Sequence, residues 1–216
     1  MTYADLKKLI IPADFGSDSY REDQPSFQPI YEQLDTTVHV NWGATQFVIV
    51  FDNADKVAKL PFCGEWVCDE EDEYEVHFES YHNDYCALTE IIYNNAVEQG
   101  LGNIFADTEY YGETADGTAI YLQEKVDVYD FADERDTASE DSKKRVRELL
   151  FNHECYWRAF ERDWLAAAID YYGEDFLHRL FKFFEEHHLD DWHDGNYGWR
   201  KDGSPVLIDW AGFDED

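Results

Sequence analysis

Basic residues are scarce in this chain of 216 residues, where 17 Lys and Arg stand against 49 Asp and Glu and leave a formal net charge of −32 at pH 7. Affinity for DNA and RNA depends on Lys and Arg that neutralise phosphates and release counterions. The composition therefore excludes a direct nucleic-acid-binding protein, and the same negative field disfavours binding to anionic membranes. It favours partners of opposite sign, such as a basic protein or a cationic small molecule.

Long apolar runs are also missing. No segment approaches the roughly 20 apolar residues of a transmembrane helix. The first ten residues, MTYADLKKLI, lack the apolar core and cleavage site of a secretory leader. The four cysteines, Cys63, Cys68, Cys86 and Cys155, include no Cys-x-x-Cys pair. We therefore expect a cytoplasmic protein with reduced thiols rather than disulfides or a zinc site.

Apolar residues are nevertheless plentiful, at 44% of the chain with 17% aromatic, which is enough for a sizeable core. Residues 1–36 predict an irregular arm with one short helix near Tyr3–Ile10. β-rich runs that predict an antiparallel meander follow at 37–42, 46–51 and 56–62. The acidic insertion at 64–80 is interpreted as a solvated loop, or else as a docking surface for a basic partner.

Helical periodicity dominates the rest of the chain. We predict a helix at 84–99 and two strands at 104–113 and 119–126, followed by a polar linker at 130–142. A helical stretch at 143–172, with a break near Asn152, and a final helix at 174–188 complete the chain. Asp116-Gly117 joins the two strands and suits a tight hairpin turn. Strands first and helices later predict an α+β protein with two unequal lobes, 37–126 and 127–216.

The most informative segment is a C-terminal hairpin. Asp202-Gly203 favours a two-residue turn, and such a turn places Asn196 directly opposite Asp209. Directly opposed residues have Cβ atoms about 5 Å apart, so an amide oxygen and a carboxylate would project side by side. Two hard oxygen ligands of this kind suit Mg²⁺. Asp191 lies five residues before Asn196, in a loop where its carboxylate is not constrained by a helix.

This arrangement resembles the catalytic loop and metal-binding Asp of the protein-kinase-like superfamily, which has the spacing Asp-x-x-x-x-Asn, a hairpin and then a metal-binding Asp. The sequence DWHDGN at 191–196 and IDW at 208–210 is closest to the aminoglycoside phosphotransferase and choline kinase branch. It also resembles short kinase-like proteins found in bacteriophage genomes. For a phage-encoded protein, the expected location is the host cytoplasm.

The resemblance implies further site residues upstream. Lys59, in Val57-Ala58-Lys59, matches the strand lysine that binds nucleotide phosphates in this superfamily, and Glu90 on the next helix matches the glutamate that orients it. Glu79 is a rival for the role of Glu90. The strand at 119–126 resembles the hinge, where backbone groups of Glu124 and Val126 would hold the adenine of ATP.

The sequence also departs from the superfamily. Leu189-Asp190 precedes Asp191 where relatives usually have His-Gly or His-Arg, and Gly43 is the one glycine in the segment expected to cover the phosphates. The chain stops seven residues after Asp209. The resemblance, which covers about 37–213, therefore implies a two-lobed kinase-like fold with an antiparallel β N-lobe and a truncated helical C-lobe.

The implied function is an ATP- and Mg²⁺-dependent phosphotransferase. In it Lys59, held by Glu90, orients the phosphates, Asn196 and Asp209 hold Mg²⁺, and Asp191 positions a hydroxyl acceptor on a protein or small molecule. The alternative is a catalytically weak or inactive kinase-like binding protein, whose acidity blocks a basic surface of a partner, such as a nucleic-acid-binding surface.

Simpler interpretations stay open. Asp191, Asn196 and Asp209 are also common as turn and cap residues. His187, His188 and His193, with the nearby aspartates, are of the type that binds zinc or iron. High acidity alone is also typical of adaptation to high salt.

Overall fold

The structure is a computed structural model that describes residues 1–19, 24–43, 45–68, 76–80, 85–129, 139–153, 160–193 and 195–210. The chain forms two compact units. The first, which we call the sheet unit, comprises Met1–Glu90 and Thr108–Glu124, and the second, the helical unit, comprises Ile91–Asp107 and Lys125–Asp216. Strands dominate one unit and helices the other, which confirms the predicted α+β class.

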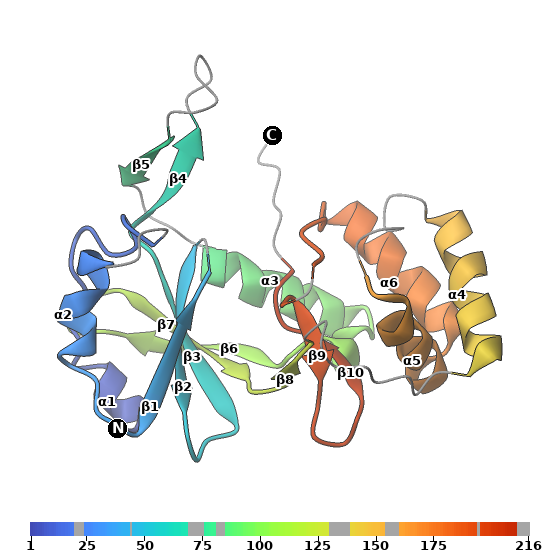
Figure 1. Cartoon of the computed structure of the whole chain (residues 1–216), viewed down its shortest axis with the longest axis horizontal. Helices are drawn as coiled ribbons and strands as arrows, with labels where there is room; N and C mark the ends of the chain where they lie inside the picture. The colour runs from blue at the N-terminus through green and yellow to red at the C-terminus, as the bar shows by residue number, and fades with distance from the viewer. Residues whose placement is uncertain are drawn as a thin grey trace. The chain divides into compact units, whose positions relative to one another are not determined.

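The sheet unit is built on five antiparallel strands in the order β1-β2-β3-β7-β6 (Figure 1). Their bounds are Val38–Trp42, Gln46–Phe51, Lys56–Pro61, Ala119–Glu124 and Thr108–Glu113. Alternation explains why they form a layered sheet, because successive side chains point to opposite faces. One face carries Phe47, Ile49, Ala58, Leu60 and Leu122, all of which lie in one apolar core.

The N-terminal arm covers this apolar face. It contains α1 (Tyr3–Leu6), the 3₁₀ turn η1 (Pro25–Phe27) and α2 (Gln28–Tyr31). Leu6, Phe15, Phe27 and Ile30 are fully buried in the same core as the strands. The predicted short helix near Tyr3–Ile10 is confirmed as α1, and the described remainder of the arm is mostly turns that pack on the sheet through these buried residues.

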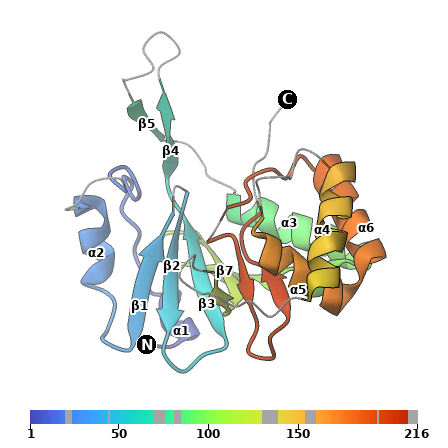
Figure 2. The same ribbon diagram turned by 45° about the vertical axis from the view of Figure 1, so that its right-hand side comes forward.

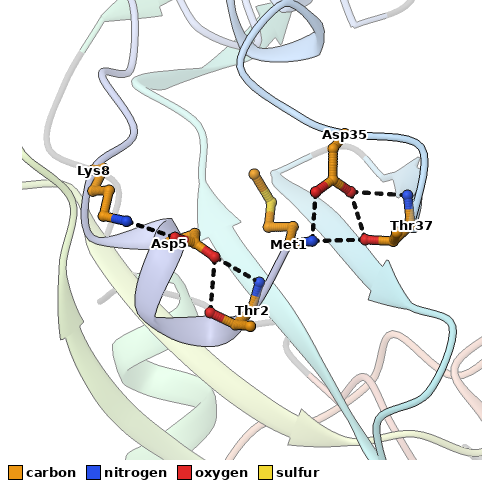
Figure 3. Close-up of polar contacts among 6 residues, drawn as sticks. All are labelled: Met1, Thr2, Asp5, Lys8, Asp35 and Thr37. Atoms are coloured by element: carbon orange, nitrogen blue, oxygen red, sulfur yellow. Dashed lines mark hydrogen bonds and ion pairs between the residues drawn. The ribbon is translucent and has the colours of Figure 1, made fainter.

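Polar contacts also tie the arm to the start of β1 (Figure 3). The amino group of Met1 donates hydrogen bonds to the Asp35 carboxylate and, at 2.7 Å, to Oγ1 of Thr37. The Met1 ammonium, followed by Thr37, lowers the pKa of Asp35 to about 2. At α1, Thr2 and Asp5 form a capping box, and Lys8 pairs with the Asp5 carboxylate at 2.6 Å.

The acidic insertion contains a strand pair. β4 (Gly64–Cys68) and β5 (Val76–Ser80) are antiparallel, with Trp66 opposite Phe78, and project away from the five-stranded sheet (Figures 1 and 2). The interpretation as a loop throughout is therefore wrong for these ten paired positions, Gly64–Cys68 and Val76–Ser80.

The helical unit packs α4 (Glu140–Asn152), α5 (Arg162–Tyr172) and α6 (Glu174–Glu186) against one another (Figure 2). It also contains the second half of α3 (Tyr85–Glu98) and the 3₁₀ turn η2 (Gly102–Ile104). The break predicted near Asn152 is confirmed, since α4 ends there and α5 begins at Arg162. The core is rich in aromatic residues, of which Trp164, Phe181, Phe183, Phe184 and Trp210 are almost completely buried.

A small sheet in this unit has the order β10-β9-β8, with bounds Pro205–Leu207, Tyr197–Trp199 and Asp127–Val128. The hairpin of β9 and β10 has a three-residue loop, so the predicted two-residue turn is wrong. Leu207 pairs with Tyr197, and the Arg200 N–H bonds the Ser204 carbonyl at 2.9 Å, which leaves three residues, 201–203, in the loop. Gly203 closes it at φ +85°, as in a type I turn followed by a glycine bulge.

The hairpin at Asp116-Gly117 also has a three-residue loop. The Thr114 N–H bonds the Thr118 carbonyl at 2.9 Å, and Gly117 has φ +93°. Asp-Gly fits both loop types, because each needs glycine at a left-handed position. The strand register therefore decides which turn forms.

The sequence predicts reduced cysteines and no transmembrane helix. Cys63 and Cys86 are free thiols, whereas Cys155 and the side chain of Cys68 lie outside the described residues. Within the described ranges, every helix is too short or too polar to cross a lipid bilayer.

Candidate functional site

Asp191 lies in a loop that two buried side chains anchor. After α6, the Leu189 N–H bonds the Phe184 carbonyl at 2.9 Å, and Leu189 is fully buried. Trp192 is 5% exposed, and its indole N–H donates to the Leu189 carbonyl at 2.9 Å. The Asp191 side chain between them is 49% exposed. The loop thus holds a half-exposed carboxylate at a fixed position.

Asn196 connects this loop to the end of the hairpin. It is 6% exposed, and its side-chain amide donates to the backbone carbonyl of Asp191 at 2.6 Å. Its own backbone carbonyl accepts the N–H groups of Ile208 at 2.9 Å and Asp209 at 3.2 Å. The structure therefore brings Asp191, Asn196 and Asp209 together.

Asn196 and Asp209 come together by a contact that differs from the predicted cross-strand pair. Because the hairpin loop has three residues, the register is shifted by one, and Asn196 does not pair directly with Asp209. The shared carbonyl of Asn196 brings the two residues together instead. The predicted cross-strand geometry is thus wrong, although the predicted proximity is found.

The charges of the cluster suit a cation. Burial raises the pKa of Asp191, and the neighbouring carboxylates of Asp209 and Asp190 raise it further, whereas His193 and a hydrogen bond from Asn196 lower it. His193 Nε2 lies 3.7 Å from Oδ1 of Asp191. Crowded carboxylates stabilise a bound cation, because the cation relieves their mutual repulsion.

A divalent ion fits the chemistry of these residues. Oδ1 of Asp209 is buried, and Asn196 is an amide from the same cluster. Mg²⁺ prefers oxygen ligands and keeps several waters, so that one or two protein ligands with phosphates are sufficient. Within the described ranges, no group of three or more His, Cys, Asp or Glu side chains is arranged to hold a metal ion. The alternative zinc or iron site at His187, His188 and His193 gains no support from those ranges.

Lys59 lies in the sheet unit, on the central strand β3, and is 6% exposed. Its strand neighbours Ala58 and Leu60 belong to the apolar core, so Lys59 points to the opposite face. It is paired with Val48 on β2 and Tyr121 on β7. A lysine is rarely this buried unless its ammonium has an anionic or polar partner.

The face that carries Lys59 is polar and buried. Gln123 donates to Oγ1 of Thr108 at 2.9 Å, and Gln46 accepts from the Cys86 thiol on α3 at 3.5 Å. Gln46, Thr108 and Gln123 are each at most 5% exposed. These three residues were not among the predicted site residues. The signal was available in part, because Gln46 begins and Gln123 ends an apolar run, each next to a core residue, Phe47 or Leu122.

Glu90 lies on α3 within the sheet unit. Its carboxylate accepts a hydrogen bond from the backbone N–H of Tyr110 on β6 at 2.8 Å. The glutamate thus ties the helix to the edge strand, and its predicted pairing with Lys59 stays a prediction. The side chain of the rival Glu79 lies outside the described residues.

The predicted adenine-binding residues lie at the end of β7. Glu124 is the last residue of that strand and pairs with Lys56 on β3. Val126 follows two residues later and belongs to the helical unit. Their role toward adenine stays a prediction.

Comparison with known proteins adds no family assignment, since neither the protein-family models nor the curated protein sequences give a match to this chain.

Proposed function

We propose that this protein is a kinase-like phosphotransferase that uses ATP and Mg²⁺. The observation that carries the proposal is the linkage of Asp191, Asn196 and Asp209 through the hydrogen bonds of Asn196. An antiparallel sheet unit whose central strand carries a buried lysine supports the same assignment, and with it a two-lobed kinase-like fold.

The proposed roles follow from the chemistry of the side chains. Lys59 neutralises charge on the nucleotide phosphates, and Asn196 and Asp209 would hold Mg²⁺, which would supply positive charge for phosphate oxygens. Asp191 accepts a hydrogen bond from the acceptor hydroxyl and aligns its oxygen. The acceptor oxygen forms a bond to the γ-phosphorus, the bond to the bridging oxygen of ADP breaks, ADP leaves, and the hydroxyl proton passes to Asp191.

The net charge of −32 favours a cationic acceptor, such as a basic protein or an amine-bearing small molecule. It also supports a second candidate, a kinase-like acidic protein that binds a basic surface without catalysis. Binding of a basic protein by this route would fall steeply with salt. It would also be insensitive to the loss of Asp191, whereas phosphoryl transfer would not.

Lys59→Met tests the nucleotide assignment, because methionine keeps a long unbranched side chain but removes the charge. A charged hydrogen bond contributes about 1.5–3 kcal/mol, so we expect ATP affinity to fall about 10- to 100-fold in calorimetric titrations. Lys56→Met is the matched control on the same strand. Lys56 pairs with Glu109 at 2.8 Å and is more exposed, so its loss should leave ATP affinity unchanged.

Unfolding temperatures without nucleotide show whether each variant keeps its fold. If Lys59→Met binds ATP as tightly as the wild type, or if Lys56→Met weakens binding equally, Lys59 is not the phosphate ligand.

A further inference from the structure

Two histidines of the helical unit face each other across α4 and α6. His153 follows the last residue of α4, and His178 lies in the second turn of α6. Nε2 of His153 lies 3.2 Å from Nδ1 of His178. Both rings belong to residues that play no part in the proposed phosphotransferase chemistry.

The outer nitrogen of each ring faces a carboxylate. Nδ1 of His153 lies 3.0 Å from Oε1 of Glu185, and Nε2 of His178 lies 3.9 Å from Oε1 of Glu174. Arg145 on α4 holds the other oxygen of Glu174 at 3.0 Å. Glu174, His178 and Glu185 follow helical spacing on one stripe of α6, which explains why Glu174 meets Arg145 on α4 while His178 and Glu185 meet His153 at its end.

The four groups lie in the order carboxylate, imidazole, imidazole and carboxylate, and they belong to Glu185, His153, His178 and Glu174. Metal-binding histidines usually donate their second ring N–H to a carboxylate, which fixes the tautomer and makes the ligating nitrogen more basic. Zinc–nitrogen bonds are about 2.0–2.1 Å long, so two nitrogens on one tetrahedral ion lie about 3.3 Å apart. The observed separation of 3.2 Å between the inner nitrogens agrees with that spacing.

We propose that His153 and His178 bind one divalent transition-metal ion, of the Zn²⁺, Ni²⁺ or Cu²⁺ class, through Nε2 and Nδ1. Imidazole is the ligand that these ions favour. Water completes the coordination, since the side chains of His153 and His178 are 12% and 35% exposed. Binding displaces the proton that the two inner nitrogens otherwise share, and it joins the end of α4 to α6.

The site is tested on the full-length, tag-free protein after treatment with a chelator. Titration with Zn²⁺ should show a site that His153→Gln and His178→Gln each remove or weaken at least tenfold. Glu185→Gln should weaken it about tenfold, the lower end of the usual effect of losing a carboxylate behind a ligand. Zn²⁺ should also raise the unfolding temperature of the wild type but not of the two histidine variants.

His39→Gln is the matched control. His39 also faces a carboxylate, with Nε2 3.0 Å from Oδ1 of Asp52, but it is 76% exposed and lies on β1 of the sheet unit. This variant should bind Zn²⁺ like the wild type. With Cu²⁺, the electron paramagnetic resonance spectrum should show two nitrogen ligands in the wild type and one in His178→Gln.

Unfolding without metal shows whether each variant is folded, and His178→Gln, at the more exposed position, is the milder of the two. Unchanged Zn²⁺ affinity in both folded histidine variants would overturn the proposal and leave the pair as a hydrogen bond. A loss of affinity in His187→Gln or His193→Gln, but not in His153→Gln or His178→Gln, would overturn it equally. The test is independent of ATP binding.

Discussion

Asp191→Asn should lower the rate of phosphoryl transfer by about 10²- to 10⁴-fold, the usual range for loss of a positioned acid–base group, while ATP affinity stays unchanged. Asparagine keeps the size of the side chain and a hydrogen-bonding oxygen, but it does not take up the hydroxyl proton. The measurement is transfer of labelled γ-phosphate to an acceptor, or to water where no acceptor is known, alongside calorimetric ATP titration.

Asp190→Asn is the matched control, because Asp190 is the adjacent exposed acid and contacts the loop through its backbone carbonyl, which accepts the Trp192 N–H at 2.8 Å. It should retain turnover. Wild-type turnover in Asp191→Asn would show that Asp191 does not position the acceptor.

The same variant has an expected effect on stability. The pKa of Asp191 is raised by burial and by Asp209 and Asp190, so the folded state holds this proton to a higher pH than the unfolded state. The folded state therefore loses stability as pH rises from the ordinary Asp pKa through the raised pKa of the folded state. Above that raised pKa, Asp191 is charged in both states, and its charge is less favourable in the folded protein than in the unfolded chain. Asp191→Asn should thus be at least as stable as the wild type at neutral pH, with a smaller decline in stability above pH 4. A less stable variant at neutral pH would contradict the direction of the shift.

Trp164→Ala should lower the free energy of unfolding by about 3–5 kcal/mol, the usual effect of removing a large buried aromatic side chain. Trp164 is 1% exposed and stacks on Phe160 at 5.3 Å between ring centroids, with Tyr197 at 4.9 Å. Its indole N–H donates to the Gly198 carbonyl on β9 at 3.0 Å. One side chain thus joins α5 to the small sheet that leads to Asn196.

Thermal unfolding checks this expectation, with a predicted fall in midpoint of roughly 6–20 °C for a chain of this length. Trp164→Phe keeps an aromatic ring, so its free energy of unfolding should fall less than that of Trp164→Ala. Phe151→Ala is the control for removal of an aromatic side chain, since Phe151 is 74% exposed and should change the midpoint little. An equal loss in Phe151→Ala and Trp164→Ala would contradict the assigned core.

Strands were predictable where β-branched and aromatic residues are dense. The run QFVIVF coincides with β2, Gln46–Phe51, because such residues fill both faces of a buried strand. The burial of the arm was not predictable, because Leu6, Phe15 and Phe27 are isolated apolar residues without a period, and their burial depends on the sheet that forms later in the chain. The strand pair of β4 and β5 was missed because the acidic composition of the insertion indicated a loop.

The candidate site was predictable in its residues and less so in its geometry. The spacing of Asp191, Asn196 and Asp209 indicated a cluster, and the structure brings them together. The turn register was missed because Asp-Gly suits two loop lengths, and only the strand pairing distinguishes them. The polar face beside Lys59 was missed because β3 pairs with β7, a neighbour more than sixty residues away in the chain.

The central claim, that the protein binds a nucleotide through magnesium, is tested most directly by thermal unfolding with excess ATP, with and without Mg²⁺, in the wild type and Asp209→Asn. At about a hundred times the dissociation constant, ligand adds about 2.7 kcal/mol of stability, which corresponds to a shift of roughly 5–10 °C. We predict a shift that requires Mg²⁺ in the wild type and in Asp190→Asn and that is lost in Asp209→Asn. A wild type that shows no shift, or an Asp209→Asn variant that keeps the full magnesium-dependent shift, would contradict the claim.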